Sequence, residues 1–294
     1  MPNVQFVTKT IQAAGAEIGT GLAGRSRIRL THPAGGVADL YPHGAQLLTW
    51  RHPEGEVLFL SAREDADQYV HAGIPIVFPQ FGKGPAGDGP LPQHGFARTS
   101  EWAIGERHVD RDGRSTVTLS LRATPELRAL WPHDFHAELD VALGETLGTT
   151  LRVVNPGPGP LSFTCGFHTY FRVSDVRKTR VEGLQGLRFR DKVAGWAERI
   201  DGDTALVATA ETDRVYLAAP QRLRIRDDKR VVRIESSGFA NVVVWNPGPA
   251  GDAKYDFAPG ESSRFICVEP ATAIEPVVLP PGATWEGRQE LAVE

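Results

Sequence analysis

Short stretches in which hydrophobic and polar residues alternate recur along the whole chain. The first four cover residues 26–31, 37–41, 46–50 and 57–60, and turn residues such as Gly and Pro separate them. Alternation with a period of two predicts strands that bury one face, and closely spaced turns are typical of sandwiches and barrels. The chain lacks the regular exchange of strands and long helices that indicates a parallel sheet. We therefore predict an all-β fold built on large antiparallel sheets.

One short helix interrupts this pattern. After a predicted strand at residues 115–122, Thr124, Pro125 and Glu126 supply an N-cap, a first-turn proline and a first-turn acid. We expect a helix that ends near Trp131. The C-terminal third returns to strands, which we predict at residues 215–218, 222–226, 231–235, 242–245 and 264–269.

The clearest alternation covers residues 161–172, which we predict to be one strand. One face carries apolar side chains, namely Leu161, Phe163, Cys165, Phe167 and Phe171. The other face carries hydroxyl residues, Arg172 and His168. A histidine in this setting suits a concave binding surface, so we expect its side chain to point away from the core. The residues alone leave open that His168 is a hydrogen-bonded strand histidine without a function.

Polar chemistry is most concentrated between His71 and Trp102. Two apolar blocks there enclose residues 82–92, a run with four glycines and three prolines that predicts a loop. Gln93, His94 and Arg98 follow directly. Loops of this kind carry polar groups to a pocket on a rigid scaffold, so these three residues are candidates for a binding site.

Composition narrows the function classes. The 294 residues are 41% hydrophobic and 23% charged, and no apolar run approaches the length of a membrane span. We expect one soluble domain over residues 1–294. A net charge of −4 argues against nucleic acid as a partner, although it permits a local basic pocket. The N-terminus lacks the pattern of a secretory signal, so the expected location is the cytoplasm. Cys165 and Cys267 are expected to be free buried thiols.

Seven strings occur in order between Gly73 and Pro270: GIPIVFPQFG, PQHGFAR, WPHDF, GFHTYFRVSD, ETDRVYL, VVVWNP and CVEP. Together they resemble the hexose-6-phosphate mutarotases, also called glucose-6-phosphate 1-epimerases, within the aldose 1-epimerase family. The resemblance implies a galactose-mutarotase-like β-supersandwich with one or two short helices. It also implies a sugar or sugar phosphate as the only partner, and neither a cofactor nor a metal. We expect a monomer.

Anomer exchange needs a base for the C1 hydroxyl proton and an acid for the ring oxygen. A carboxylate with an ordinary pKa near 4.3 is ionised at neutral pH, and a histidine with a pKa near 6.5 can carry a proton there. Glu269, which we place at the end of its strand just before Pro270, suits the first role, and His168 suits the second. The resemblance implies the same assignment.

The resemblance also implies five substrate-binding residues. His94 corresponds to a second active-site histidine, and Asp213 to an acid that binds sugar hydroxyls. Gln93 and Arg98 match positions that contact sugar or phosphate. His71 stands where we expect an arginine in phosphosugar enzymes, so the phosphate is less well supported than the anomer chemistry. Three of these residues also have a structural alternative. His94 could be a structural loop histidine, Asp213 could lie in a surface turn, and Arg98 could pair with a structural acid.

Three other functions stay open. The first is a mutarotase for free aldoses, which the replacement at His71 leaves possible. The second is a non-catalytic carbohydrate-binding sandwich, which would need aromatic platforms but no positioned acid and base. The third is a metal-dependent isomerase with His94, His168 and Glu269 as ligands, although the short ligand spacing of cupins is missing.

Overall fold

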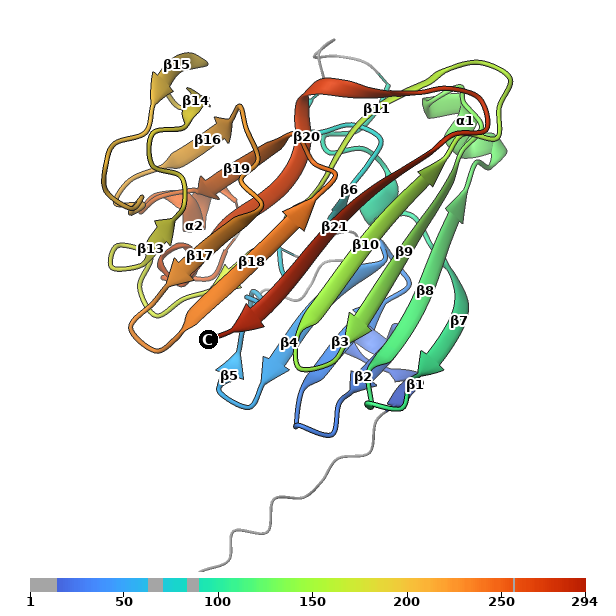
Figure 1. Ribbon diagram of the computed structural model, residues 1–294, viewed down its shortest axis with the longest axis horizontal. Helices are drawn as coiled ribbons and strands as arrows, with labels where there is room; N and C mark the ends of the chain where they lie inside the picture. The colour runs from blue at the N-terminus through green and yellow to red at the C-terminus, as the bar shows by residue number, and fades with distance from the viewer. Residues whose placement is uncertain (1–14, 63–70, 84–89, 256) are drawn as a thin grey trace, which may run out of the picture.

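The strands form three antiparallel sheets, which confirms the predicted all-β fold (Figure 1). The computed structural model describes residues 15–62, 71–83, 90–255 and 257–294. Segments that are far apart in the sequence share a sheet. The last strand, for example, lies between two strands from earlier parts of the chain. Within the described ranges, no helix has both the length and the hydropathy that crossing a membrane requires.

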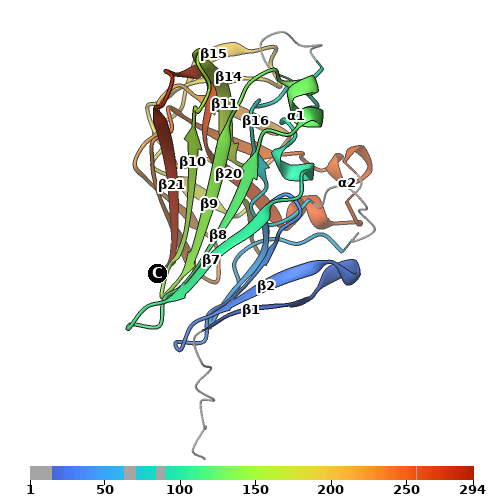
Figure 2. The same cartoon turned by 90° about the vertical axis from the view of Figure 1, so that its right-hand side faces the viewer.

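The N-terminal residues form a five-stranded sheet, which lies at one end of the two larger sheets (Figure 2). Its strands follow the chain in order: β1 (Gly15–Thr20), β2 (Ser26–Thr31), β3 (Val37–Tyr41), β4 (Gln46–His52) and β5 (Gly55–Glu56). Three of the four strands predicted here are confirmed. The fourth is wrong, because Leu58 and Leu60 form only isolated bridges with Phe171 and Ala72.

The second sheet has eight strands in the order β13-β17-β18-β21-β10-β9-β8-β7. Their bounds are β13 (Arg180–Glu182), β17 (Arg222–Arg226), β18 (Val231–Ser237), β21 (Thr284–Val293), β10 (Leu147–Val154), β9 (His136–Leu143), β8 (Ser115–Arg122) and β7 (Ala103–Val109). The predicted helix is confirmed as α1 (Pro125–Leu130) between β8 and β9. Its N-cap is Thr124, whose side chain accepts a 3.3 Å hydrogen bond from the Leu127 N–H.

The third sheet carries the candidate site. Its order is β15-β14-β16-β19-β20-β11-β6, and β12 also pairs with β20. The bounds are β15 (Ala197–Ile200), β14 (Arg188–Asp191), β16 (Thr212–Tyr216), β19 (Asn241–Asn246), β20 (Phe265–Leu279), β11 (Leu161–Phe167), β6 (Ile76–Val77) and β12 (Tyr170–Arg172). The remaining helices are short: α2 (Gly251–Lys254) and the 3-10 turns Leu22–Gly24, Ala97–Thr99 and Glu261–Ser263.

Alternation along β20 separates the main core from the candidate site. Ile266 and Val268 belong to the main core, which the second sheet closes. Cys267 and Glu269 lie on the opposite face, as the period of two requires. This second face carries two small apolar clusters, one around Tyr170 and Cys267 and one around Phe81 and Val243. The candidate site lies between these clusters.

The structure corrects two predicted strand boundaries. Residues 161–172 form two strands rather than one, because β11 ends at Phe167 and β12 begins at Tyr170. Glu269 is not at a strand end, because β20 continues to Leu279. Pro270 is tolerated there because it falls between the pairing of β20 with β12 and its pairing with β11, where a missing N–H removes no bond to either strand.

Candidate active site

All seven predicted site residues line one pocket of about 230 Å³ on the outer face of the third sheet: His71, Gln93, His94, Arg98, His168, Asp213 and Glu269. Six further residues complete its wall, namely Phe81, Tyr170, Lys192, Val243, Trp245 and Tyr255. The sequence motifs therefore converge in space, although they span nearly 200 residues of the chain.

His168 occupies the break between β11 and β12. Its N–H donates a 3.0 Å hydrogen bond to the Pro75 carbonyl, so the backbone pairs with a loop instead of a strand. The imidazole stacks on Tyr170 at 4.9 Å between ring centroids, and its edge meets Trp245 at 5.7 Å. It lies on the face away from the main core, as expected, but it is buried, with 8% of the residue exposed. The aromatic rings of the Tyr170 cluster enclose it.

His168 and Glu269 form a histidine–carboxylate pair in the pocket. The distance from His168 Nε2 to Glu269 Oε1 is 3.5 Å, and the Glu269 side chain is almost fully buried. Three buried polar atoms here have no hydrogen-bond partner among the described residues: His168 Nδ1, Glu269 Oε2 and Asp213 Oδ1. Because an unsatisfied buried polar atom is costly, their convergence indicates a polar ligand.

Asp213 holds a lysine that the sequence did not reveal. Asp213 lies on β16, and its Oδ2 is 2.8 Å from Lys192 Nζ. Lys192 comes from the turn after β14, in a stretch of sequence without a recognisable motif. Only the pairing of β14 with β16 brings this turn to the pocket. Lys192 therefore supplies a positive charge beside the two carboxylates.

His94 is held in a strained turn. Its φ is +67°, a value that L residues adopt rarely, and its N–H donates a 2.7 Å hydrogen bond to the Gly82 carbonyl. Gly95 is required next, because a Cβ there would lie 2.2 Å from the Phe78 carbonyl oxygen. The Gly82 N–H donates to Nδ1 at 3.3 Å, so a neutral His94 carries its proton on Nε2. His94 can then donate that proton to a ligand oxygen.

Arg98, Gln93 and His71 lie around the mouth of the pocket. Arg98 donates from Nη2 to the Gln93 carbonyl at 2.8 Å, which fixes the guanidinium next to the loop. Gln93 itself is exposed at the rim. The His71 ring packs on Phe257 at 5.0 Å between centroids.

Burial controls the protonation of these groups. Desolvation, followed by the Arg98 charge, lowers the pKa of His168 to about 3. The same two causes lower the pKa of His71 to about 4. The pKa of His94 falls well below its usual value through burial and its neighbour His168. His71 is therefore neutral at pH 7 and cannot replace the charge of an arginine.

The pKa of Glu269 moves in the opposite direction. Burial raises it well above its usual value, Asp213 raises it further, and Lys192 opposes the rise. Burial therefore shifts the pKa values of both groups away from the ordinary values that the sequence led us to expect. The sequence does not show how completely both groups are removed from water.

One group of side chains has the composition of a metal site. Ligand atoms of His168, Cys267 and Glu269 lie within 4.8 Å of one another, and all three residues are buried. This set differs from the His94, His168 and Glu269 set considered from sequence. A metal would require the thiolate and the carboxylate, whereas burial raises the pKa values of both Cys267 and Glu269 well above their usual range. A metal bound here would therefore have to displace a proton from each of them.

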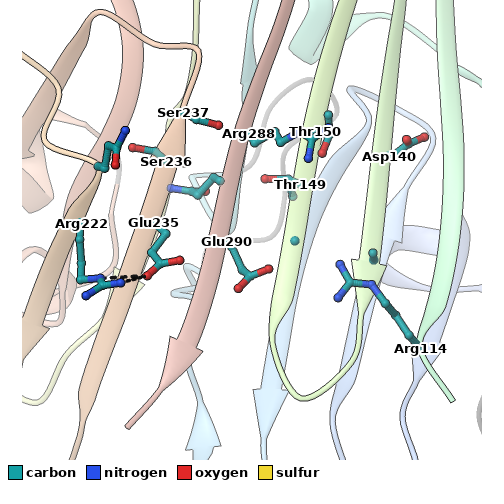
Figure 3. A pocket seen from close by; sticks show the side chains of 14 residues that line it. Arg114, Asp140, Thr149, Thr150, Arg222, Glu235, Ser236, Ser237, Arg288 and Glu290 are labelled. Carbon is teal, nitrogen blue, oxygen red and sulfur yellow. Dashed lines mark hydrogen bonds and ion pairs between the residues drawn. The ribbon is translucent and has the colours of Figure 1, made fainter. Parts of the chain in front are cut away.

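A larger cleft of about 700 Å³ lies on the solvent face of the second sheet (Figure 3). Its wall combines arginines with carboxylates, and Arg222 pairs with Glu235 at 2.8 Å. None of its lining residues within the described ranges is a histidine. It lacks the buried acid and base pair that distinguishes the smaller pocket.

The site thus places a buried imidazole beside a buried carboxylate in a small polar pocket on a three-sheet antiparallel scaffold. The family described as Aldose 1-epimerase matches residues 26–292, and the chain belongs to this family. It is therefore an isomerase. The predicted galactose-mutarotase-like fold is confirmed.

Three relatives show how far the similarity extends. A protein of Cenchrus ciliaris, provisionally named glucose-6-phosphate 1-epimerase, is 37% identical over 87% of this chain and 80% of its own. An Escherichia coli K12 protein with the same provisional name is 38% identical over 79% of this chain and 78% of its own. The solved structure of a provisionally named mutarotase from Salmonella typhimurium superposes with a TM-score of 0.84 at 31% identity, over 95% of this chain and 96% of that one.

Proposed function

We propose that this protein interconverts the α and β anomers of a hexose 6-phosphate, with glucose 6-phosphate as the preferred substrate. The observation that carries the proposal is the 3.5 Å approach of His168 Nε2 to Glu269 Oε1 in a pocket that also contains Asp213, His94 and Arg98. The names of the relatives support the choice of substrate.

The pair can perform acid and base catalysis with a single proton. Within the pair this proton resides on Glu269, because burial raises the pKa of Glu269 and lowers that of His168. Moving the proton across the 3.5 Å gap converts the pair into a carboxylate and an imidazolium. Sugar hydroxyls that donate to Glu269 Oε2 would favour this charged form, because hydrogen bonds to a carboxylate stabilise its ionised state.

The charged pair then opens the ring. Glu269 takes the proton of the C1 hydroxyl while His168 gives its proton to the ring oxygen, and the C1–ring oxygen bond breaks to leave an open-chain aldehyde. Rotation about the C1–C2 bond and reversal of both proton transfers close the ring as the other anomer. His94, with its proton on Nε2, can donate to a sugar oxygen, and Asp213 Oδ1 can accept from a hydroxyl.

Arg98 is the candidate contact for the phosphate, because a guanidinium binds an anion with two parallel hydrogen bonds. A free-aldose mutarotase is the second candidate function. It is favoured by His71, which lies in the pocket at the place of an expected arginine and whose pKa of about 4 leaves it uncharged at pH 7.

Anomer exchange measured by NMR saturation transfer on glucose, galactose and their 6-phosphates tests the proposal. We expect exchange to be fastest on glucose 6-phosphate and to fall by roughly a hundredfold or more in Glu269→Gln, in line with general-base contributions. Faster exchange on free glucose would support the second candidate. Exchange at the parent rate in Glu269→Gln would contradict the assignment of the base.

A further inference from the structure

A second cavity of about 540 Å³ adjoins the candidate active site. The two share Phe81, Gln93 and Lys192, so they lie side by side. The catalytic pocket, at about 230 Å³, suits one sugar ring, because it lies below the size of sites for larger ligands. A molecule longer than one ring would extend into the adjoining cavity.

The adjoining cavity is positively charged. Lys83, Arg190 and Lys192 line it, and the lining contains no carboxylate within the described ranges. Lys192 is paired with Asp213. Lys83 and Arg190, by contrast, have no carboxylate within ion-pair distance in the part of the chain that the structure describes. Two cations without such a partner, beside a cavity, favour a ligand with an anionic group.

Trp196 forms an aromatic wall of the same cavity. It is 52% exposed, and its φ of +67° is rare for a bulky residue. Its N–H donates a 2.8 Å hydrogen bond to the Asp191 carbonyl, which holds the turn in this conformation. Strain of this kind, with a large ring left in solvent, often marks a functional position. Val215, Ala273 and Ile274 add apolar surface.

These features together favour a phosphorylated sugar ring as the ligand of the adjoining cavity. A pyranose ring has a face of C–H groups that can pack on an indole, and a phosphate on that ring can accept hydrogen bonds from a lysine and an arginine. Anomer exchange requires a free C1 hydroxyl on the ring in the catalytic pocket. We propose that the adjoining cavity is a subsite for the second ring of a phosphorylated disaccharide, whose reducing ring occupies the catalytic pocket. This inference rests on the proposed function for its first ring.

Binding affinity tests the subsite without requiring turnover. Calorimetry would compare maltose 6′-phosphate, which carries its phosphate on the second ring, with maltose and glucose 6-phosphate. We expect maltose 6′-phosphate to bind the wild type at least about tenfold more tightly than maltose, from the charged hydrogen bonds to its phosphate. Equal affinities would overturn the proposal.

Two substitutions locate the contact. Trp196→Ala and Arg190→Gln should each weaken the binding of maltose 6′-phosphate by about tenfold, and the binding of glucose 6-phosphate by much less. The matched controls are Ile200→Ala, which removes another exposed apolar side chain, and Arg180→Gln, which removes an exposed charge on β13. Neither control lines the cavity, and neither should change the affinities. Equal weakening of both ligands by Arg190→Gln would instead place the phosphate of the monosaccharide in this cavity and overturn the proposal.

Calorimetry together with the exchange assay described above separates the two proposals. If no aldose is turned over but the affinities follow the expected pattern, the subsite stands and the isomerase assignment to hexose phosphates fails. If glucose 6-phosphate is turned over but neither Trp196→Ala nor Arg190→Gln changes the affinity for maltose 6′-phosphate, the subsite proposal is wrong and the proposed function stands.

Discussion

Replacing Lys192 with methionine should move the alkaline limb of the pH–rate profile to higher pH, because the proton shared by the catalytic pair rests on Glu269. The Lys192 ammonium lies 2.8 Å from Asp213 Oδ2, and it is the group that holds down the pKa of Glu269 against burial and against Asp213. Methionine keeps most of the side-chain length and removes the charge.

The magnitude follows from the charges around Glu269. An opposite charge close to a carboxyl group lowers its pKa by about 1 to 3 units, and each unit corresponds to about 1.4 kcal/mol. Asp213 would gain a proton more readily once Lys192 is gone, which relieves part of its repulsion of Glu269. We therefore expect the pKa of Glu269 to rise by about one unit, at the low end of this range. Because this proton must move from Glu269 to His168 before the ring opens, kcat/KM below the alkaline limb should fall about tenfold.

The assay is anomer exchange by NMR saturation transfer between pH 5 and pH 9. Lys192→Arg keeps the charge and should keep the position of the alkaline limb. Lys229→Met, which removes a lysine outside the pocket, should leave the whole profile unchanged. The shift in Lys192→Met should be the same for every sugar that is turned over, since it belongs to the enzyme. An unshifted alkaline limb in Lys192→Met, or an equal shift in Lys192→Arg, would refute the reasoning.

Three further predictions follow from the same geometry. Glu269→Gln should raise the melting temperature at pH 7 more than at pH 4.5. The pKa of Glu269 is higher in the folded protein than in the unfolded chain, so this group lowers stability as pH rises above about 4.3. An equal gain in melting temperature at both pH values would contradict this. His71→Gln should reduce the loss of unfolding free energy between about pH 6.5 and pH 4. With a pKa of about 4 in the folded protein, His71 binds its proton more tightly in the unfolded chain, so acid favours unfolding. An unfolding free energy that falls with pH in parallel with the wild type would count against this. Arg98→Ala should raise KM for a hexose 6-phosphate by about ten- to hundredfold more than for the free hexose, and equal effects would favour the free-aldose mutarotase.

The sequence by itself determined the local structure and the residues that gather at the site. Alternation with a period of two placed His168 on the face away from the main core, because successive side chains of a strand point to opposite faces. The helix at Pro125–Leu130 was predictable because Thr124 and Pro125 act through neighbouring backbone groups. The seven candidate residues were found through motifs, and all of them line one pocket.

Only the tertiary structure decided how these residues meet and which protons they hold. His168 and Glu269 are 101 positions apart in the sequence. Glu269 lies on β20, which pairs with the strands on both sides of His168, and this pairing brings Nε2 to within 3.5 Å of Oε1. Lys192 joins them because β14 pairs with β16, a contact that leaves no local pattern. The pKa values of Glu269 and His168 move in opposite directions because rings and strands from distant segments exclude water from both. Desolvation depends on everything that surrounds a group in space, and a linear sequence does not record those neighbours.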